Sequence, residues 1–190
     1  MRWIYRHPRI YDLVDTVFSF ALSDRLRRRV LNGLSSTSLL DIGVGSGKCL
    51  KRVSASLILG VDTSVRMLNR AQARFPGARL ILGSAHSLPL RDGSVEVSIF
   101  SYSLSVLSRP VEAVREALRV SSKVIVIEYD KPSFIPGFLW HKVLGRFGWR
   151  VYGSTNIDFM TIESLARKKI AQSFCGRLYR VVVLEGAKHA

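Results

Sequence analysis

Cysteine is scarce in this sequence, and long uncharged apolar runs are missing. The only two cysteines, Cys49 and Cys175, are too few for a disulfide framework, which fits a reducing compartment. No stretch reaches the roughly 18 apolar residues that a membrane span requires. Charges such as Arg6 and Asp12 stand where a signal peptide would need an unbroken apolar run. We therefore expect no secreted, membrane-spanning or disulfide-stapled protein.

Acidic residues are also few. The sequence has 14 Asp and Glu against 29 Lys and Arg, a net charge of +15, which predicts attraction to anionic partners or surfaces. Apolar residues make up 47% and charged residues 23%, a balance typical of globular proteins. A chain of 190 residues is long enough for one domain with its own core. We expect a cytoplasmic protein, and peripheral contact with an anionic membrane or with RNA stays open.

Short apolar runs alternate with helical patterns through the middle of the chain. The expected strands are Ser38–Ile42, Leu57–Val61, Arg79–Leu82, Val95–Phe100 and Val124–Glu128. The expected helices between them are Gly47–Ser54, Ser64–Phe75 and Val111–Val120. This alternation predicts an α/β fold with a doubly wound, mostly parallel sheet of six or seven strands.

The two ends of the chain frame this core in a single expected domain over residues 1–190. Residues 1–32 predict an N-terminal helical segment, residues 38–130 the core, and residues 131–160 an insertion. In residues 161–190 we expect a helix over Thr161–Ser173 and a last strand over Arg180–Glu185. The partner of that strand is expected within Phe174–Leu178, if it exists.

A glycine-rich turn follows the first strand, in the segment LLDIGVGSGK. Gly43, Gly45 and Gly47 let the backbone approach a ligand closely, and the helix expected behind them would offer free N–H groups to an anion. The P-loop and dinucleotide patterns both fail, since Lys48 is not followed by Ser or Thr and is itself not glycine. An ordinary tight turn would also account for the three glycines.

An aspartate at the end of the second strand supports a ligand site. Asp62 lies about twenty residues beyond the first glycine, where an acid can accept hydrogen bonds from a ribose diol. Asp62 could instead cap the following helix, but Ser64 already stands in position to do so.

Four segments together resemble the class I S-adenosylmethionine (SAM) dependent methyltransferases, and most closely those of ubiquinone/menaquinone biosynthesis. They are DIGVGSG, DTSVRML, GSAHSLPLRDGSVEVSIF and RPVEAVREALRVSSKVIVIE. The resemblance covers residues 11–128 and implies a Rossmann-like methyltransferase fold that uses SAM and releases S-adenosylhomocysteine.

The resemblance also implies roles for individual residues. The glycine turn and Asp41 would meet the amino-acid end of SAM, and Asp62 would hold the ribose. Ser84 stands where the family usually has an Asp that accepts from the adenine amino group, so we expect weaker adenine discrimination. The full set of implied SAM-binding residues is Tyr11, Asp41, Gly43, Gly45, Gly47, Asp62, Thr63, Met67, Ser84, Ala85, Ser101 and Tyr102.

No general base is dictated by spacing. The candidates near the expected strand ends are His86, Tyr102, Tyr129 and Asp130. Each also has a structural interpretation, as a loop residue, a pocket wall or a turn residue. The sequence has no zinc-type spacing of Cys and His, and we expect no metal.

The range of possible methyl acceptors is limited mainly by sequence signatures that this chain lacks. The fourth strand is followed by SYSLSVL rather than the Asn/Asp-Pro-Pro-aromatic signature of enzymes that methylate exocyclic amines of bases. Cys49, in the first helix, and Cys175, near the last strand, are expected to be structural. The apolar segment Phe134–Tyr152 could pack into the core or cover a bulky acceptor. We expect C- or O-methylation of a small hydrophobic or aromatic acceptor such as a lipophilic quinone.

The basic charge supports a competing hypothesis of an RNA or protein methyltransferase. Three clusters could follow a phosphate backbone or be solvated surface: Arg25 with Arg27–Arg29, Arg66 with Arg70 and Arg74, and Arg167–Lys169. The excess of Arg, with little Asn or Gln, also fits a thermophilic origin. A SAM-binding protein without turnover is a third hypothesis, and the sequence is silent on the oligomeric state.

Overall fold

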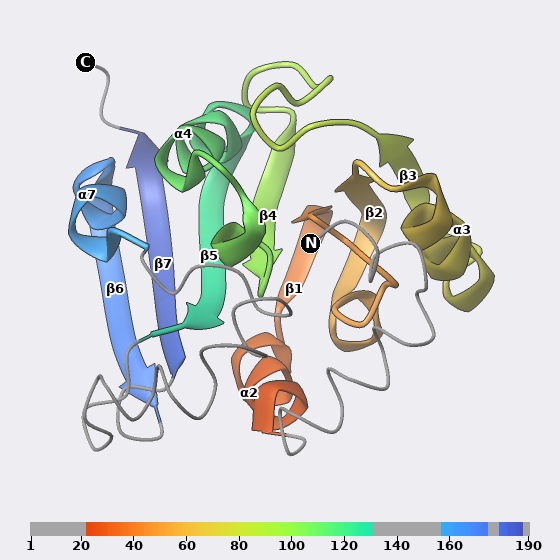
Figure 1. Cartoon of the computed structure of the whole chain (residues 1–190), viewed down its shortest axis with the longest axis horizontal. Coiled ribbons are helices and arrows are strands. Elements are labelled where there is room, and N and C mark those ends of the chain that lie inside the picture. Colours follow the sequence, from red (N-terminus) through yellow and green to blue (C-terminus); the bar gives the residue numbers. More distant parts are fainter. Residues whose placement is uncertain (1–21, 131–156, 175–178, 188–190) are drawn as a thin grey trace.

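The computed structural model describes residues 22–130, 157–174 and 179–187, and in these residues the chain forms one seven-stranded sheet (Figure 1). The strands are β1 (Ser35–Ile42), β2 (Ser54–Asp62), β3 (Arg79–Leu82), β4 (Val95–Ser101), β5 (Ser121–Tyr129), β6 (Ala166–Phe174) and β7 (Tyr179–Ala187). The helices are α2 (Leu22–Leu31), α3 (Val65–Arg74), α4 (Pro110–Val120) and α7 (Phe159–Ser164), with the 3₁₀ helices η2 (Leu50–Arg52) and η3 (Leu104–Val106).

The sheet has the order β3-β2-β1-β4-β5-β7-β6. The first five strands pair in parallel, whereas β7 pairs antiparallel with both β5 and β6. This confirms the expected α/β fold with a doubly wound, mostly parallel sheet. The number of strands is seven in the described part of the chain.

Each face of the sheet is covered by different helices. On β1, Leu40 and Ile42 join the core that α4 and α7 cover. Leu39 packs with Leu26 and Leu31 of α2 on the other face. Because side chains alternate along a strand, Asp41 points to the same face as Leu39, beneath α2.

Helix α3 forms where the sequence predicts it. The Ser64 side chain caps the helix by accepting a hydrogen bond from the Met67 N–H at 3.4 Å. Met67, Leu68 and Ala71 are buried, at the spacing of one helical face. The expected capping role of Ser64 is confirmed.

The helix expected over Gly47–Ser54 is wrong. The chain makes turns and the three-residue η2, and β2 already begins at Ser54. Parallel pairing of Ser54 with Ser35, and of Ala55 with Ser36, draws these residues into the sheet. Too few residues then remain between β1 and β2 for an α-helix as well as the return of the chain. The glycine turn therefore has no α-helix behind it.

The helix expected over Thr161–Ser173 is also wrong. Helix α7 ends at Ser164, and Ala166–Phe174 form β6, whose Ile170 is opposite Val183 of β7. Pairing with the open edge of β7 overrides the local helical propensity of this segment. The partner strand of β7 was expected within Phe174–Leu178. It is instead β6, which ends at Phe174.

Two expectations fall outside the described residues. They are the helical pattern before residue 22, which includes Tyr11, and most of the 131–160 insertion, which includes Phe134–Tyr152. The part of the N-terminal segment that is described forms α2, as predicted.

The loop that follows β3 is held by one arginine of α4. Arg119 donates to the carbonyl oxygens of Leu88 and Leu90, at 3.1 and 3.0 Å. It also bonds the carboxylates of Asp92 and Glu116. Glu116 in turn accepts from the Leu88 N–H at 2.8 Å. This loop therefore depends on Arg119 for its conformation.

Replacing Arg119 should destabilise the protein. Arg119→Met removes the donor that two loop carbonyls and two carboxylates share, and we expect it to lower the free energy of unfolding by about 2–3 kcal/mol. The exposed Arg115, on the same helix, is the matched control, and Arg115→Met should change it by less than about 0.5 kcal/mol. Urea unfolding measures both, and equal effects of the two variants would contradict the role assigned to Arg119.

Candidate functional site

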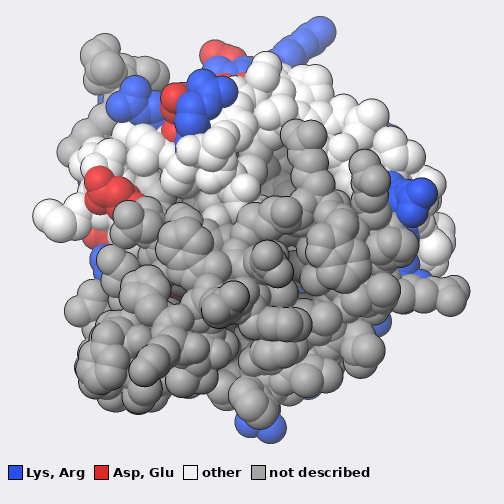
Figure 2. All heavy atoms as spheres, in the orientation of Figure 1, with Lys and Arg blue, Asp and Glu red and all other residues white. Residues whose placement is uncertain are grey.

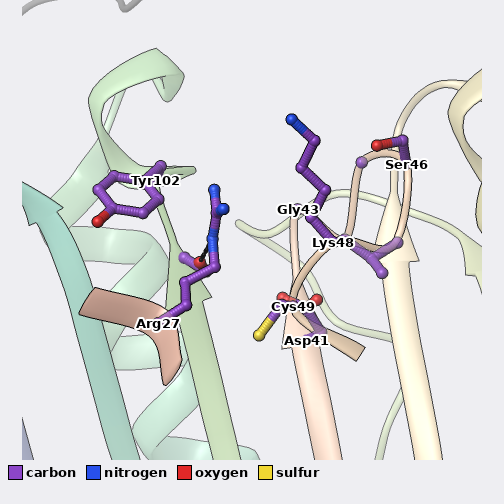
Figure 3. Close-up of a pocket in the computed structure, with 10 residues that line it drawn as sticks. Arg27, Asp41, Gly43, Ser46, Lys48, Cys49 and Tyr102 are labelled. Atoms are coloured by element: carbon purple, nitrogen blue, oxygen red, sulfur yellow. Dashed lines mark hydrogen bonds between the residues drawn. The ribbon is translucent and has the colours of Figure 1, made fainter. Parts of the chain in front are cut away.

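A hollow lies at the carboxyl ends of β1 and β4, beneath α2 (Figure 3). Its lining residues are Arg27, Asp41, Gly43, Val44, Gly45, Ser46, Lys48, Cys49, Ser101 and Tyr102. Five of them, Asp41, Gly43, Gly45, Ser101 and Tyr102, are implied SAM-binding residues. The hollow thus brings together residues of both strands that were expected at the amino-acid end of SAM, but Gly47, which was also expected there, does not line it.

The three glycines of the turn have different reasons to be glycine. All have positive φ, at +74° for Gly43, +52° for Gly45 and +80° for Gly47. A Cβ on Gly43 would lie 2.6 Å from Ser103 Cβ, and one on Gly47 would lie 3.2 Å from Ala71 Cα. A Cβ on Gly45 would meet only the Gly43 carbonyl oxygen, at 3.9 Å. Gly43 and Gly47 therefore serve packing, while Gly45 keeps backbone open beside the hollow.

The Asp62 carboxylate holds the turn in place. It accepts from the Gly45 N–H and from the Ser64 N–H, each at 2.9 Å, so it joins the glycine turn to the start of α3. Burial raises the pKa of Asp62, and these two hydrogen bonds oppose that shift. Each carboxylate oxygen has a second acceptor site, so Asp62 can still bind a ribose diol.

Arg74 supports the same turn from α3. Its guanidinium donates to the carbonyl oxygen and to the hydroxyl of Ser46, both at 3.0 Å. Arg74 was grouped with Arg66 and Arg70 as a basic stripe, but it is half-buried against the loop. It therefore acts in the architecture of the site, a role that its charge pattern did not reveal.

Asp41 is the most unusual group in the hollow. Its side chain is 1% exposed, and neither carboxylate oxygen has a hydrogen bond of ordinary geometry. Burial raises its pKa to about 7, the Arg27 charge opposes this, and the nearby Asp62 adds to it. The Cys49 thiol lies beside the carboxylate and lowers the pKa weakly. A buried carboxylate without a partner is a binding site for a donor or cation.

Arg27 lines the hollow, a position that sequence reasoning missed. It is 4% exposed on α2, its Nε donates to Ser101 Oγ at 3.0 Å, and its guanidinium lies 4.7 Å from the centre of the Tyr102 ring. From the sequence, Arg27 was expected in a basic cluster that either follows a phosphate backbone or is solvated surface. Ser23, Arg27 and Leu31 recur every four residues and are all buried, so the spacing could have placed Arg27 on the inner face of α2.

The position predicted for Cys49 is wrong. It was expected in a first helix, and it lies instead in the turn that replaces that helix, buried at the floor of the hollow (Figure 3). Burial raises the pKa of its thiol well above the ordinary value, and the Asp41 charge adds to this. A thiol kept protonated in this way is a weak donor, not a nucleophile.

Tyr102 connects the hollow to a group of aromatic rings. Among the described residues it is the one non-glycine residue with positive φ, at +57°, and its N–H bonds the Ile127 carbonyl oxygen at 2.8 Å. Its ring centre lies 4.8 Å from that of Tyr129, which lies 5.4 Å from that of Tyr179. The three rings, here called the tyrosine cluster, stand beside Arg27 at the ends of β4 and β5 and the start of β7.

The residues expected near adenine lie on the other side of Asp62. Ser84 and Ala85 follow β3, and Ser84 Oγ accepts from the His86 N–H at 3.2 Å and lies 3.3 Å from His86 Nδ1. Thr63 is exposed, and Met67 is buried within α3. Since β3 is three strands from β4, His86 stands apart from the hollow and from the other three base candidates.

Asp130 and Glu128 form a second buried acidic region. Asp130 faces Arg180 at 3.7 Å, and Arg180 also bonds Glu163. Glu128, which the sequence analysis did not single out, accepts from the Ser105 and Tyr129 N–H groups, and burial raises its pKa to about 7. Glu128 alternates with Ile127 and Tyr129, so it points to the face opposite the hollow.

The described residues offer neither a membrane span nor a metal site. None of the helices there has the length and apolar character of a membrane span. In the same residues, no three His, Cys, Asp or Glu side chains stand close enough to hold a metal ion.

Comparison with known proteins agrees with this geometry. Residues 40–123 match the family model of a methyltransferase domain. A demethylmenaquinone methyltransferase of Thermotoga maritima is 29% identical over 143 residues, which are 70% of this chain and 62% of that protein. A ubiquinone/menaquinone biosynthesis C-methyltransferase of a Ruegeria species is 24% identical and covers 94% of this chain and 80% of its own length.

The fold is also found among solved structures. A SAM-dependent methyltransferase from Thermotoga maritima superposes with a TM-score of 0.74 at 21% identity, covering 95% of this chain and 96% of that one. The chain spans less than two thirds of the length of the demethylmenaquinone methyltransferases that it matches.

The isolated carboxylate of Asp41 should limit the stability of the ligand-free protein. An acid whose pKa is raised on folding does not lower the free energy of unfolding below its unfolded pKa, near 3.8. It lowers the free energy of unfolding most above its folded pKa, near 7. Asp41→Asn should therefore raise the free energy of unfolding by about 2–4 kcal/mol at pH 8.5, and by less at pH 5.

Urea unfolding at both pH values tests this expectation. Glu112→Gln is the control, because Glu112 is exposed on α4 and should show no such dependence on pH. If Asp41→Asn stabilised the protein equally at the two pH values, the buried charge would not be the cause.

Proposed function

We propose that the chain is a class I SAM-dependent methyltransferase that binds SAM across the carboxyl ends of β1 and β2 and transfers the methyl group. One observation carries the proposal: the unpaired, buried Asp41 carboxylate at the floor of a hollow that also holds Arg27. The amino-acid end of SAM carries an ammonium that can bond Asp41. The residues present therefore fit the cofactor.

The remaining contacts follow the order of the strands. Asp62 would accept from the ribose hydroxyls while it keeps its bonds to the turn. The open side of Gly45 would face the methionine moiety, where any Cβ would stand in the way. Ser84, the Ala85 backbone and Thr63 would border the adenine. Ser84 Oγ already accepts from the His86 N–H. It would therefore accept a weaker hydrogen bond from the adenine amino group than the usual carboxylate would.

The chemistry asks the protein mainly for alignment. When bound, SAM supplies a methyl group that its positive sulfur activates. The chain must hold the acceptor atom in line with that methyl at about 3–3.5 Å and exclude water. Ser101 and Tyr102, at the end of β4, would close the site beside the methionine moiety. The left-handed backbone at Tyr102 fixes its ring under Arg27.

We propose a small hydrophobic or aromatic acceptor, methylated at carbon or oxygen. Support comes from the relatives named for menaquinone and ubiquinone biosynthesis and from the tyrosine cluster beside the hollow. An acceptor ring could stack on Tyr102 or Tyr129. If a base is needed, Tyr129 and Tyr102 are better placed than His86, which follows β3, or Asp130, which faces Arg180.

The basic surface gives less support to RNA or protein as acceptor. Of the three clusters, Arg27 and Arg74 are used inside the site, Arg28 pairs with Asp24 at 3.3 Å, and Lys169 pairs with Glu163 at 3.5 Å. On the described part of the face in Figure 2, basic side chains are scattered in small groups rather than in one band. We therefore keep RNA and protein as outcomes of the test below.

A methyl added at Gly45 should block the cofactor. Gly45→Ala and Gly33→Ala both place Ala at positive φ with no close neighbour, so each should cost about 1 kcal/mol of stability. Only Gly45 borders the hollow, and we expect Gly45→Ala to weaken S-adenosylhomocysteine binding at least about tenfold, while Gly33→Ala leaves it unchanged. Calorimetry measures both affinities. Unchanged binding by Gly45→Ala would exclude a ligand over this turn.

The acceptor class can be tested without knowing the acceptor. The protein is incubated with methyl-labelled SAM and a cell extract, and the products are separated into lipid, RNA and protein. We expect the label in the lipid fraction, and no label with Asp41→Asn, which removes the charge that would hold the SAM ammonium. Label in RNA or protein would contradict the proposed acceptor. Label in no fraction would favour a SAM-binding protein without turnover.

A further inference from the structure

We propose that an extended acidic segment of a partner protein adds to the sheet as a further strand along β6. The segment would place an acidic side chain opposite Lys168 and, two residues along, an apolar side chain opposite Ile170. Figure 1 shows β6 as the outermost strand of the sheet in the described part of the chain. This surface shares no lining residue with the hollow, so the inference does not depend on the proposed SAM binding.

The first reason is that β6 is exposed over almost its whole length. The strand has nine residues, and those from Arg167 to Ser173 are all exposed. In an antiparallel pair, every second residue directs its N–H and C=O away from the partner strand, so the outer edge of β6 presents a row of backbone donors and acceptors. Proteins usually shorten or cover such an edge. A long exposed edge is the surface to which an extended segment can add by main-chain hydrogen bonds.

The second reason is a row of alternating charges that ends at Lys168. Lys123 of β5 pairs with Glu185 of β7 at 2.9 Å, and Lys168 of β6 is directly opposite Glu185. Two lysines thus share one carboxylate, and the row across the three strands is positive, negative, positive. Opposite charges on directly opposite residues stabilise a strand pair, whereas like charges destabilise it. An acidic residue would therefore continue this row in an added strand.

The third reason is an apolar row on the same face. Ile125 of β5 and Ile170 of β6 are both directly opposite Val183 of β7. Exposure rises towards the edge, since Ile125 is 4% exposed, Val183 is half-buried and Ile170 is 71% exposed. An apolar side chain of an added strand would cover Ile170. The groove at this edge is lined by Arg167, Lys168, Lys169, Ile170, Val183 and Glu185.

The composition of β6 favours a partner protein over a second copy of this chain. The strand has three basic residues, Arg167–Lys169, and no Asp or Glu, so a second β6 could not supply the acid and would bring like charges together. The net charge of +15 also attracts an acidic partner. A phosphate surface would match the basic residues but would leave the backbone edge of β6 unused.

A synthetic peptide can take the place of the partner segment. The probe Thr-Glu-Thr-Val-Thr-Glu-Thr has Glu and Val two residues apart and the same sequence in both directions, so it fits a parallel or an antiparallel strand. One control peptide has Gln in place of both Glu residues. Another has N-methylated central amides, so it keeps the charges but cannot pair through its backbone. NMR titration of the whole isotope-labelled chain measures binding of the three peptides.

We expect the probe to shift the amide signals of β6 and to slow hydrogen exchange at every second amide of β6, because only those amides face the added strand. The Gln peptide should bind at least about threefold more weakly, since it lacks the charge opposite Lys168. The N-methylated peptide should bind at least about tenfold more weakly, since the main-chain hydrogen bonds are lost.

Charge reversal on β6 separates this contact from general attraction to a basic protein. Lys168→Glu should weaken binding of the probe about fivefold, because an ion pair becomes a like-charge pair. Lys51→Glu is the matched control, since Lys51 is exposed on η2 and the net charge changes equally. It should change the affinity by less than about twofold. If Lys168→Glu failed to fold, the probe and its N-methylated form would still decide the question on the unaltered chain.

Four results would overturn the inference. The first is that the unaltered chain does not bind the probe, and the second is that the N-methylated peptide binds equally well, which would mean contact by charge alone. The third is a shift of amide signals outside β6 with none in β6. The fourth is that β6 instead joins two copies of the chain in sedimentation and hydrogen exchange, or binds RNA or anionic vesicles in preference to the probe. None of these results would affect S-adenosylhomocysteine binding, which is measured separately.

Discussion

The bridge that Asp62 makes between the glycine turn and the start of α3 is the constraint on which the site depends. By accepting from the Gly45 and Ser64 N–H groups, this carboxylate fixes the turn relative to β2. Arg74 reinforces the same turn through Ser46. A turn with no α-helix behind it would otherwise have few contacts to hold its shape. Side chains thus supply the rigidity that a helix would give.

The polar character of the hollow comes mainly from two charged side chains, Asp41 and Arg27. Asp41 is buried at the end of β1, next to the buried Arg27 of α2, and burial of its charge is costly. The Arg27 charge offsets part of this cost, and Arg27 is itself held by a hydrogen bond to Ser101 Oγ. A cofactor that carries an ammonium would relieve this cost on binding, and the stability lost in the free protein is recovered as affinity.

The sheet topology then decides which chemistry can occur where. The order β3-β2-β1-β4-β5 separates the expected adenine side, after β3, from the tyrosine cluster at β4 and β5. The antiparallel β7 brings Tyr179 back beside Tyr129, which extends the aromatic surface next to the hollow. An acceptor would therefore meet aromatic rings on one side and the cofactor on the other.

The sequence by itself determined the parallel core and the position of Asp41, the glycines and Asp62, because alternating patterns and turn residues act locally. It could not place Arg27 or the strand Ala166–Phe174. A run of arginines predicts an exposed surface, and Arg27 is buried only because α2 packs on the sheet. Strand β6 forms only because β7 offers an open edge. The missing helix after Gly47 was likewise decided by pairing between β1 and β2. These features depend on contacts distant in sequence, and only the tertiary structure supplies them.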